Sequence, residues 1–556
     1  MILDYVQASG AFTARIERGN DALIRRLMHT HGFDFSTSAS NRGTALLFTK
    51  EPYAAVDFIE HATDNARAQL QSIHDAIQDS WRDSSDAHIR VPMDKELWPF
   101  QRASVAYALR RDRCLIGDQP GLGKTPIAIA YANEISAKSV LVICPANIRL
   151  QWADRIREWS TLPWPYVVYP IISGRHGVHP SAHWTIVSYD LARTEEIGRA
   201  LARRLYDLVI LDEAHYLKTI DTGRTRAVFG DHTDWCRKQL KEGGWENLFP
   251  AIASRAGAVL ALTGTPLPNR PREAYVLSRK FCWDAIDFMS EERFNERFNP
   301  VARLQGVRSD GSTYDYTREE VGRGPELQAR LRANFMVRHL KRDVMPQLKL
   351  PVYDIVRVEE SRAVKSALAA ESLLDIDPEM LSSGDITVNG QWAIVRHMIG
   401  LAIAPQVGDY AAMCLDGGED KIVIFAWHKD VLDLLQNRLS RFGVLRIDGS
   451  TSALQRKARV DAFVSQPRAR VMLGNTMALG TGTDGLQKVS AHCLIAEPDP
   501  VPGSNEQAID RLDRGGQTRT VLADLFVAPG SLLEKILEIA LRKRHNTHVA
   551  LDERAA

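Results

Sequence analysis

The chain has 556 residues, several times the ~150 of a typical domain, so a peptide or a single small module is excluded. Its 45% hydrophobic and 25% charged residues are an ordinary globular composition. A net charge of +1 gives little long-range attraction for a polyanion, so any contact with nucleic acid must use a local basic patch.

The spacing of the six cysteines and the composition of the first residues exclude further classes of protein. No two cysteines are spaced as C-x-x-C, so neither a zinc knuckle nor a disulfide scaffold is indicated. The first residues lack a basic segment followed by an apolar stretch, and no apolar run approaches the ~18 residues of a membrane span. We therefore expect a soluble, cytoplasmic chain with no membrane partner.

Residues 1–90 predict a small N-terminal α+β accessory domain. Helical periodicity at 21–31 is followed by a turn, an apolar strand at 45–49 and further helices between 52 and 81.

Two later stretches repeat one rhythm of a short apolar strand, a turn and a helix-period segment. This rhythm is typical of a parallel sheet covered by helices on both faces. In residues 91–280 strands are expected at 113–117, 140–144, 185–188, 208–211 and 259–263. In residues 351–556 they are expected at 422–426, 444–447, 470–473, 492–496 and 522–527. The fold class is therefore α/β with two lobes.

Residues 281–350, between the lobes, predict a helical insertion with a Gly/Ser/Asp loop at 306–316. From 323 to 349 the chain carries seven Lys and Arg residues against two acidic residues. Two interpretations stay open: a solvated helix face, or a surface along a nucleic-acid path formed by Arg330, Arg332 and Arg338.

A glycine-rich turn, DQPGLGKT at 118–125, joins the first strand of residues 91–280 to a helix-period segment. Such a turn offers backbone N–H groups and the positive end of a helix dipole to phosphates. Lys124 is expected to reach the β- and γ-phosphates of a nucleotide, and Thr125 to ligate Mg²⁺.

A second motif, DLVILDEAH at 207–215, ends an apolar strand on two carboxylates. Asp212 is placed to hold Mg²⁺, and Glu213 to polarise the attacking water. The two motifs together predict a nucleoside-triphosphate hydrolase.

In chain order, DQPGLGKT, LVICPANIRLQW, IVSYD, DEAHYLK and LTGTPLPN resemble the motifs of superfamily-two helicases, and among these the Swi/Snf-related translocases. KIVIFAWHKDVLDLL, RIDGSTS, MALGTGTDGL and QAIDRLDRGGQ extend the resemblance, which covers residues 98–543. RPREAY at 270–275, MVRHLKRDV at 336–344 and FAWHKDVLDLL at 425–435 resemble the annealing-helicase (HARP) branch more than the nucleosome remodellers. Residues 32–49 loosely resemble a HARP module.

The resemblance implies two RecA-like lobes that hydrolyse ATP with Mg²⁺ as cofactor. Arg511 and Arg514 of the second lobe would reach the γ-phosphate, and Gln101 would recognise adenine. The implied nucleotide-binding set is Gln101, Asp118, Gly121, Gly123, Lys124, Thr125 and Gln517. The implied contacts to the nucleic-acid backbone, without sequence specificity, are Asn147, Arg149, Trp152, Ser188, Tyr189, Thr265, Trp427, Lys429, Thr451 and Thr481.

The function that these motifs favour is an ATP-dependent double-stranded-DNA translocase that remodels or reanneals DNA or processes forks. Two alternatives remain open: a strand-separating replication or repair helicase, and a DNA-stimulated motor subunit of a nuclease or replication complex. Duplex, forked or single-stranded DNA is the expected partner in each case, with replication or repair proteins as further partners.

Overall fold

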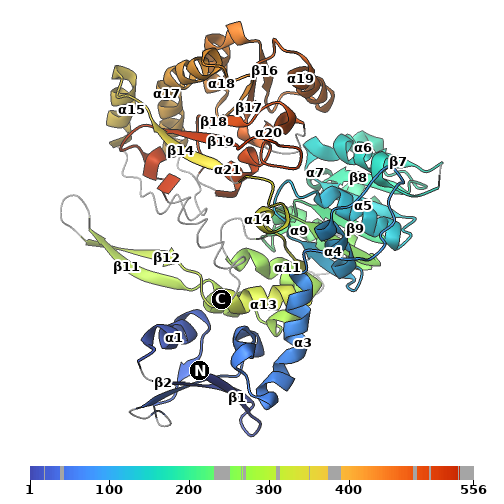
Figure 1. Ribbon diagram of the computed structural model, residues 1–556. Helices are drawn as coiled ribbons and strands as arrows, with labels where there is room; N and C mark the ends of the chain where they lie inside the picture. The colour runs from blue at the N-terminus through green and yellow to red at the C-terminus, as the bar shows by residue number, and fades with distance from the viewer. Residues whose placement is uncertain are drawn as a thin grey trace, which may run out of the picture.

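The computed structural model describes residues 1–17, 19–37, 40, 43–163, 165–230, 251–264, 266, 271–307, 313–349, 351–372, 390–479, 485–499, 502–535 and 537–538. They form an N-terminal unit, two parallel-sheet lobes and a connecting region that contacts all three (Figure 1). The α/β class with two RecA-like lobes, a helical insertion and a small N-terminal α+β domain is confirmed.

The N-terminal unit is a four-stranded antiparallel sheet in the order β1-β2-β4-β3, with helices packed on it. Only one of its strands was predicted, although the Ser9-Gly10 turn between β1 and β2, where Gly10 has a φ of 62°, is a turn signal. A hydroxyl cap starts its long helix, since Thr63 Oγ1 accepts from the N–H of Ala66. Its elements are β1 (Ile2–Val6), β2 (Ala11–Glu17), α1 (Asp21–Arg25), β3 (Asp34–Phe35), β4 (Thr44–Thr49), α2 (Pro52–Ala55) and α3 (Asp64–Ser80).

Lobe one is a seven-stranded parallel sheet in the order β13-β5-β10-β9-β6-β8-β7. Strands such as β6 and β10 are buried along their whole length, as expected when helices cover both faces. Its elements are α4 (Pro99–Ala108), β5 (Arg113–Ile116), α5 (Lys124–Glu134), β6 (Val140–Cys144), α6 (Arg149–Trp159), β7 (Val168–Pro170), β8 (Trp184–Ser188), α7 (Tyr189–Ala192), α8 (Glu195–Ala202), β9 (Leu208–Asp212), α9 (Gly223–Phe229) and β10 (Ala258–Leu262).

The connecting region contributes a strand to lobe one and a helix that packs on the N-terminal unit. Its strand β13 pairs with β5 and so forms an edge of the lobe-one sheet, while α13 packs on α3 of the N-terminal unit (Figure 1). Where a loop was expected at 306–316, the chain forms a hairpin whose strands flank residues outside the described ranges. The elements are α11 (Tyr275–Phe281), α12 (Glu291–Phe298), β11 (Val301–Val307), β12 (Thr313–Glu319), α13 (Gly324–Asn334), β13 (Met336–Val337) and α14 (Lys341–Val344).

Lobe two is a six-stranded parallel sheet in the order β14-β19-β18-β15-β17-β16. Its five predicted strands are present, and β14 adds an unpredicted edge. The elements are β14 (Val352–Arg357), α15 (Arg362–Ser372), α17 (Gly390–Asp416), β15 (Ile422–Ala426), α18 (Lys429–Arg438), β16 (Val444–Ile447), α19 (Ala453–Ser465), β17 (Val471–Asn475), α20 (Thr476–Leu479), β18 (His492–Ile495), α21 (Pro502–Ile509) and β19 (Leu522–Val527).

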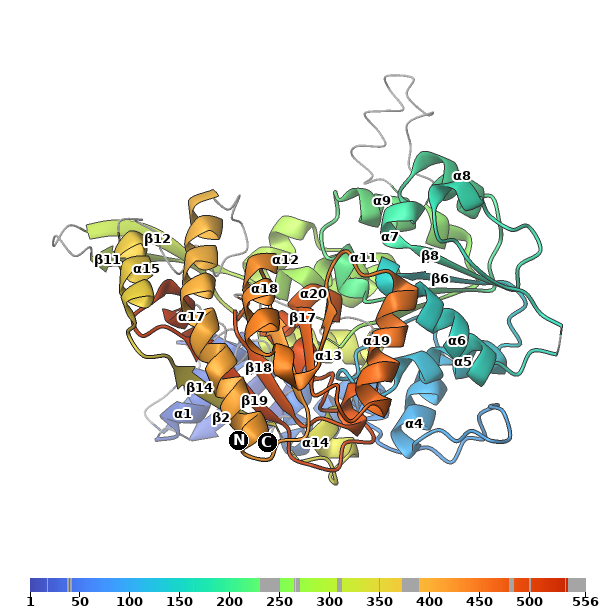
Figure 2. The same cartoon turned by 90° about the horizontal axis from the view of Figure 1, so that it is seen from above.

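Helix α17 runs beside α18 over lobe two (Figure 2). Over Ala393–Asp416 it is long and apolar enough to cross a membrane by length and composition, so the expectation that no run approaches a span was wrong. This is weak evidence for a membrane segment, because core helices pass the same test. Val395, Ile399, Ile403 and Val407 of this helix are buried in the core of lobe two.

Candidate nucleotide and nucleic-acid sites

A cavity of about 500 Å³ lies between the two lobes, at the carboxyl edge of the lobe-one sheet. Ligands of open α/β sheets bind at this edge because the loops after the strands converge there. Predicted residues that line the cavity are Gln101, Gly121, Gly123, Lys124, Thr125, Asp212, Glu213, Arg511 and Arg514. The structure therefore brings together residues up to 413 positions apart, from Gln101 to Arg514.

The phosphate loop has the backbone conformation that its glycines allow. Gly121 and Gly123 have φ values of 86° and 76°, and a Cβ at Gly123 would lie 2.4 Å from Gln101 Nε2. Lys124 begins helix α5, and its Nζ donates to the carbonyl oxygens of Asp118 at 2.7 Å and Gln119 at 3.3 Å. Burial lowers the pKa of Lys124, which is opposed by the nearby carboxylate of Glu213. Bound phosphate would give this amine a better partner than loop carbonyls.

Strand β9 delivers the acidic pair to the cavity. Asp212 Oδ2 accepts from Trp152 Nε1 at 2.7 Å, and burial together with the charge of Glu213 raises the pKa of Asp212 to about 6. Glu213 has a positive φ of 52°, which is unusual for a residue with a side chain. His215 Nδ1 lies 3.3 Å from Glu213 Oε2 and 3.2 Å from Thr263 Oγ1, so it links the acidic pair to the end of β10.

The arginine pair enters the cavity from lobe two. Arg511 Nε donates to the carbonyl of Gln507 at 3.3 Å, and Arg514 Nε to that of Asp510 at 3.0 Å. A Cβ at Gly121 would lie 2.8 Å from Arg514 Cβ, so this segment rests directly on the phosphate loop.

Gln101 lines the cavity, but both ends of its amide contact backbone. Its Oε1 accepts from the N–H of Trp98 at 2.9 Å, and its Nε2 donates to the carbonyl of Leu122 at 3.0 Å. Gln101 thus fastens α4 to the phosphate loop, which places the exposed ring of Trp98 at the cavity.

Two side chains predicted to bind nucleotide, Asp118 and Gln517, do not line this cavity, and their role in nucleotide binding stays a prediction. Asp118 is fully buried and accepts from the N–H of His339 at 2.8 Å and from Ser104 Oγ at 3.2 Å. Gln517 Nε2 donates to the carbonyls of Ser490 at 2.9 Å and Leu512 at 3.2 Å. Each side chain makes its hydrogen bonds to partners within the chain, and through them it stabilises the loops that carry the site.

A second hollow, of about 310 Å³, also lies between the lobes. It contains two of the predicted nucleic-acid contacts, Asn147 and Tyr189. The ring of Tyr189 stacks on that of Tyr216 with centroids 5.5 Å apart, and its hydroxyl donates to the carbonyl of Asp212 at 2.9 Å. The lining residues are Pro145, Ala146, Asn147, Tyr189, Asp190, Tyr216, Arg224, Gly449, Arg456 and Asn475.

Arg456, in helix α19, is the most informative residue of this hollow that sequence reasoning missed. Among the described residues its Nε and Nη1 atoms have no hydrogen-bond partner although they are buried. Burial also lowers the pKa of its guanidinium. An arginine on a helix usually marks a solvated face, so its position in the sequence carried no signal.

Trp152 and Arg149 do not line this hollow, so their contact with nucleic acid stays a prediction. Trp152 is 2% exposed and lines the nucleotide cavity, where its ring N–H is held by Asp212. The guanidinium of Arg149 donates to the carbonyls of Ala146 at 2.9 Å and Ile172 at 3.0 Å. Both side chains brace helix α6.

Ser188 and Thr451 serve local turns. Ser188 Oγ caps α7 by accepting from the N–H of Leu191 at 3.3 Å, and Thr451 Oγ1 accepts from the N–H of Asp448 at 3.0 Å. Neither lines the second hollow.

Trp427 and Lys429 lie at the carboxyl end of β15. The N–H of Trp427 donates to Glu497 at 2.7 Å, whereas Lys429 begins α18 with an exposed side chain. Thr265 and Thr481 lie outside the described residues.

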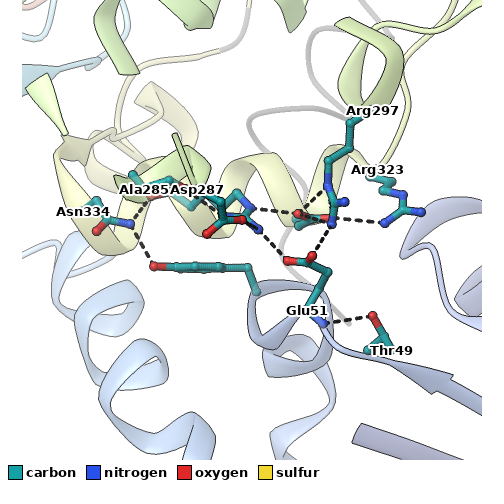
Figure 3. A network of polar contacts seen from close by, with 10 residues as sticks. Thr49, Glu51, Ala285, Asp287, Arg297, Arg323 and Asn334 are labelled. Atoms are coloured by element: carbon teal, nitrogen blue, oxygen red, sulfur yellow. Dashed lines mark hydrogen bonds and ion pairs between the residues drawn. The ribbon is translucent and has the colours of Figure 1, made fainter. Parts of the chain in front are cut away.

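Four of the seven basic residues at 323–349 are buried, namely Arg330, Arg332, Arg338 and Lys341, whereas Arg342 and Lys349 are exposed. The interpretation of Arg330, Arg332 and Arg338 as a nucleic-acid surface was therefore wrong, and a solvated face describes only the exposed residues of the stretch. Arg330 and Arg332 are 0% exposed. Arg330 donates to Glu326 at 2.8 Å, Asp287 at 2.7 Å and Glu51 at 2.6 Å, which ties α13 to the N-terminal unit. Figure 3 labels two of these partners, Glu51 and Asp287. The guanidinium of Arg332 lies 3.3 Å from the ring centroid of Trp81. Sequence spacing could not reveal that acidic and aromatic partners arrive from distant segments.

Other lining residues of the nucleotide cavity were also missed. Gln507 opens the segment that carries the arginine pair, so its motif could have indicated it. Gln151 likewise belongs to the quoted motif LVICPANIRLQW. Trp98, Met345 and Gln487 carry no such signal, since the fold alone brings them to the cavity.

Comparison with known proteins agrees with this geometry. The SNF2-related domain matches residues 99–232, and the helicase conserved C-terminal domain matches residues 410–516. The DNA annealing helicase and endonuclease ZRANB3 of Mus musculus is 27% identical over 470 residues, 83% of this chain and 41% of the relative. The SWI/SNF-related matrix-associated actin-dependent regulator of chromatin subfamily A-like protein 1 of Xenopus tropicalis is 29% identical over 450 residues, 79% of this chain and 43% of the relative.

This chain thus spans about two fifths of the length of these curated relatives. Among solved structures, the Sulfolobus solfataricus SWI2/SNF2 ATPase core in complex with dsDNA is 16% identical. The match covers 85% of this chain and 96% of that chain, with a TM-score of 0.36.

Proposed function

We propose that this chain, which matches an SNF2-related domain and a helicase C-terminal domain, is a Swi/Snf-related ATPase of the superfamily-two helicases that translocates on double-stranded DNA. The product of that motion would be remodelled or reannealed DNA. The observation that carries the proposal is a nucleotide cavity built from both lobes, with Lys124 on one wall and Arg514 on the other.

Two cationic walls suit phosphoryl transfer. Charge on the transferred γ-phosphoryl is stabilised by preorganised cations, so hydrolysis needs both lobes at once. Glu213 lines the same cavity and would accept the proton of the attacking water. Trp152, which is buried and donates to Asp212, would limit the access of bulk water to this carboxylate.

The donor set of the cavity fits Mg²⁺. Thr125 offers a hydroxyl and Asp212 a carboxylate, which are the oxygen ligands that this ion prefers. Bound there with ATP, Mg²⁺ would neutralise phosphate charge and orient the β- and γ-phosphates.

The second hollow supplies a path for the nucleic-acid backbone. Arg456 comes from lobe two and Asn147 from lobe one. A nucleic-acid strand bound in the hollow would therefore contact both lobes, and its contacts would change whenever the lobes move apart or together. Opening and closing of the lobes during ATP turnover would then move the strand. The buried, unpartnered guanidinium atoms of Arg456 are suited to a phosphate oxygen, and such contacts carry no sequence information.

ATPase rates with duplex, forked and single-stranded DNA test the proposal. We expect duplex and forked DNA to raise turnover at least tenfold more than single strands of equal nucleotide concentration, and ATP to drive displacement of a third strand from a triplex. Strongest stimulation by single strands, with net strand separation, would favour the helicase alternative. No stimulation by any DNA would refute the proposal.

Arg456→Ala tests the path itself. It should weaken duplex binding and lower the log–log salt slope by about 0.9, the value for one phosphate contact. Arg468→Ala, an exposed arginine three residues beyond the end of α19, is the matched control and should leave the slope unchanged. Equal salt slopes for the two variants would remove Arg456 from the path.

A further inference from the structure

The short helix α14 lies at the junction of the two lobes (Figure 1), and its first residue, Lys341, is only 7% exposed. Its ammonium group contacts the carboxylate of Asp510 and lies 2.7 Å from Asp513 Oδ2. It also donates to the carbonyl of Asp513. A buried lysine with two carboxylates from the opposite lobe is a specific arrangement, because lysine is rarely buried unless it is paired.

The backbone of the same residue is tied to lobe one. The N–H of Lys341 donates to Gln119 Oε1 at 2.7 Å, and Gln119 belongs to the phosphate loop. The carbonyl of Gln119 in turn accepts from the catalytic amine of Lys124 at 3.3 Å. One residue therefore joins the phosphate loop of lobe one to the arginine segment of lobe two.

The two carboxylates alternate with the arginine pair along the chain. Asp510 precedes Arg511, and Asp513 precedes Arg514. Without the ammonium group they would be buried anions beside the guanidinium groups that are meant for the γ-phosphate. They would then compete with the phosphate for those cations.

Apolar packing holds α14 in the same place. Met345, directly after the helix, clusters with Phe100 of α4 and Leu122 of the phosphate loop. A Cβ at Gly515 would lie 3.7 Å from the Met345 methyl carbon, so this packing also meets the arginine segment.

We propose that Lys341 is a positioning residue that fastens the arginine segment to the phosphate loop and compensates its two carboxylates. ATP turnover then depends on the charge of a residue that lies outside the cavity lining. The inference rests on the proposed ATPase activity.

Four variants of the full chain test it: Lys341→Met, Lys341→Arg, Asp513→Asn and the double variant Lys341→Met with Asp513→Asn. For each we would measure kcat and KM for ATP without DNA, the Kd of a fluorescent ATP analogue, and the melting temperature. We expect Lys341→Met to lower kcat at least 30-fold with the Kd changed less than threefold. Lys341→Arg should keep at least a third of wild-type kcat.

The double variant separates positioning from general stability. Asp513→Asn alone should cost about threefold in kcat, since Asp510 still pairs with Lys341. The double variant should lose less than tenfold, because it leaves one unpaired carboxylate instead of two. If the losses multiply, or if Lys341→Met keeps kcat within threefold, the proposal is overturned. Should Lys341→Met fail to fold, Asp513→Asn and Lys341→Arg decide alone: full activity of Asp513→Asn or inactivity of Lys341→Arg overturns it.

A second interlobe ion pair supplies the control. Lys457 of α19 lies 3.1 Å from Asp154 of α6, and the two side chains are 66% and 52% exposed. Exposed pairs contribute little, so Lys457→Met should change kcat less than twofold. Because turnover is read without DNA, failure of DNA stimulation would refute the proposed translocase and leave the role of Lys341 to be judged separately.

Discussion

Replacement of Arg514 by alanine should remove most ATP turnover and leave ATP binding largely intact. Arg514 lies 390 positions from Lys124, yet its Cβ lies 2.8 Å from the position of a Cβ at Gly121 in the phosphate loop. A unit charge about 4 Å from the transferred phosphoryl, at an effective dielectric constant of about 20, contributes about 4 kcal/mol. That energy corresponds to about 10³ in rate, the lower end of the range for arginine fingers.

The assay is steady-state ATP hydrolysis at saturating ATP, with the affinity of a fluorescent ATP analogue measured in parallel. Arg514→Lys should not restore turnover, because a lysine lacks the planar fork of an arginine. The matched control is Arg519→Ala, five positions after Arg514. Its side chain is 45% exposed and lies 3.8 Å from Glu419, which follows helix α17, and the variant should keep turnover within twofold of wild type. Turnover by Arg514→Ala within a few-fold of wild type would refute the two-lobe catalytic reasoning.

Three further predictions follow from the geometry. Lys124→Ala should lose ATP binding, whereas Glu213→Gln should bind ATP and hydrolyse it slowly; equal affinities, or near-normal turnover by Glu213→Gln, would contradict the separate roles. Arg330→Met should lower the free energy of unfolding by about 3–5 kcal/mol, because it leaves buried carboxylates uncompensated, and a denaturant midpoint near that of wild type would argue against this. Burial of His339 opposes protonation, but Asp118 raises the pKa of His339 above its ordinary value. The stabilisation by the protonated His339 is therefore complete below about pH 6.5 and is lost as the pH rises through the folded-state pKa. His339→Gln should make the melting temperature depend less on pH over that range.

The sequence by itself determined the two lobes and predicted residues that line the candidate nucleotide site. Strands buried on both faces are continuous apolar runs, so ten lobe strands could be placed from local composition. Four cavity residues could be predicted from the sequence for a similar reason, because each lies at the end of a strand or the start of a helix, where local geometry fixes its direction. They are Lys124, Thr125, Asp212 and Glu213.

Only the tertiary structure decided the use of the remaining polar residues. Arg330 has the sequence context of a surface residue, and its burial depends on Glu51, which lies 279 positions earlier (Figure 3). Trp152 belongs to a motif expected to contact nucleic acid, yet its ring N–H binds Asp212. Local sequence encodes burial through periodicity, but the partner of a buried charge or donor is supplied by whichever distant segment packs against it. That choice is made by the fold as a whole.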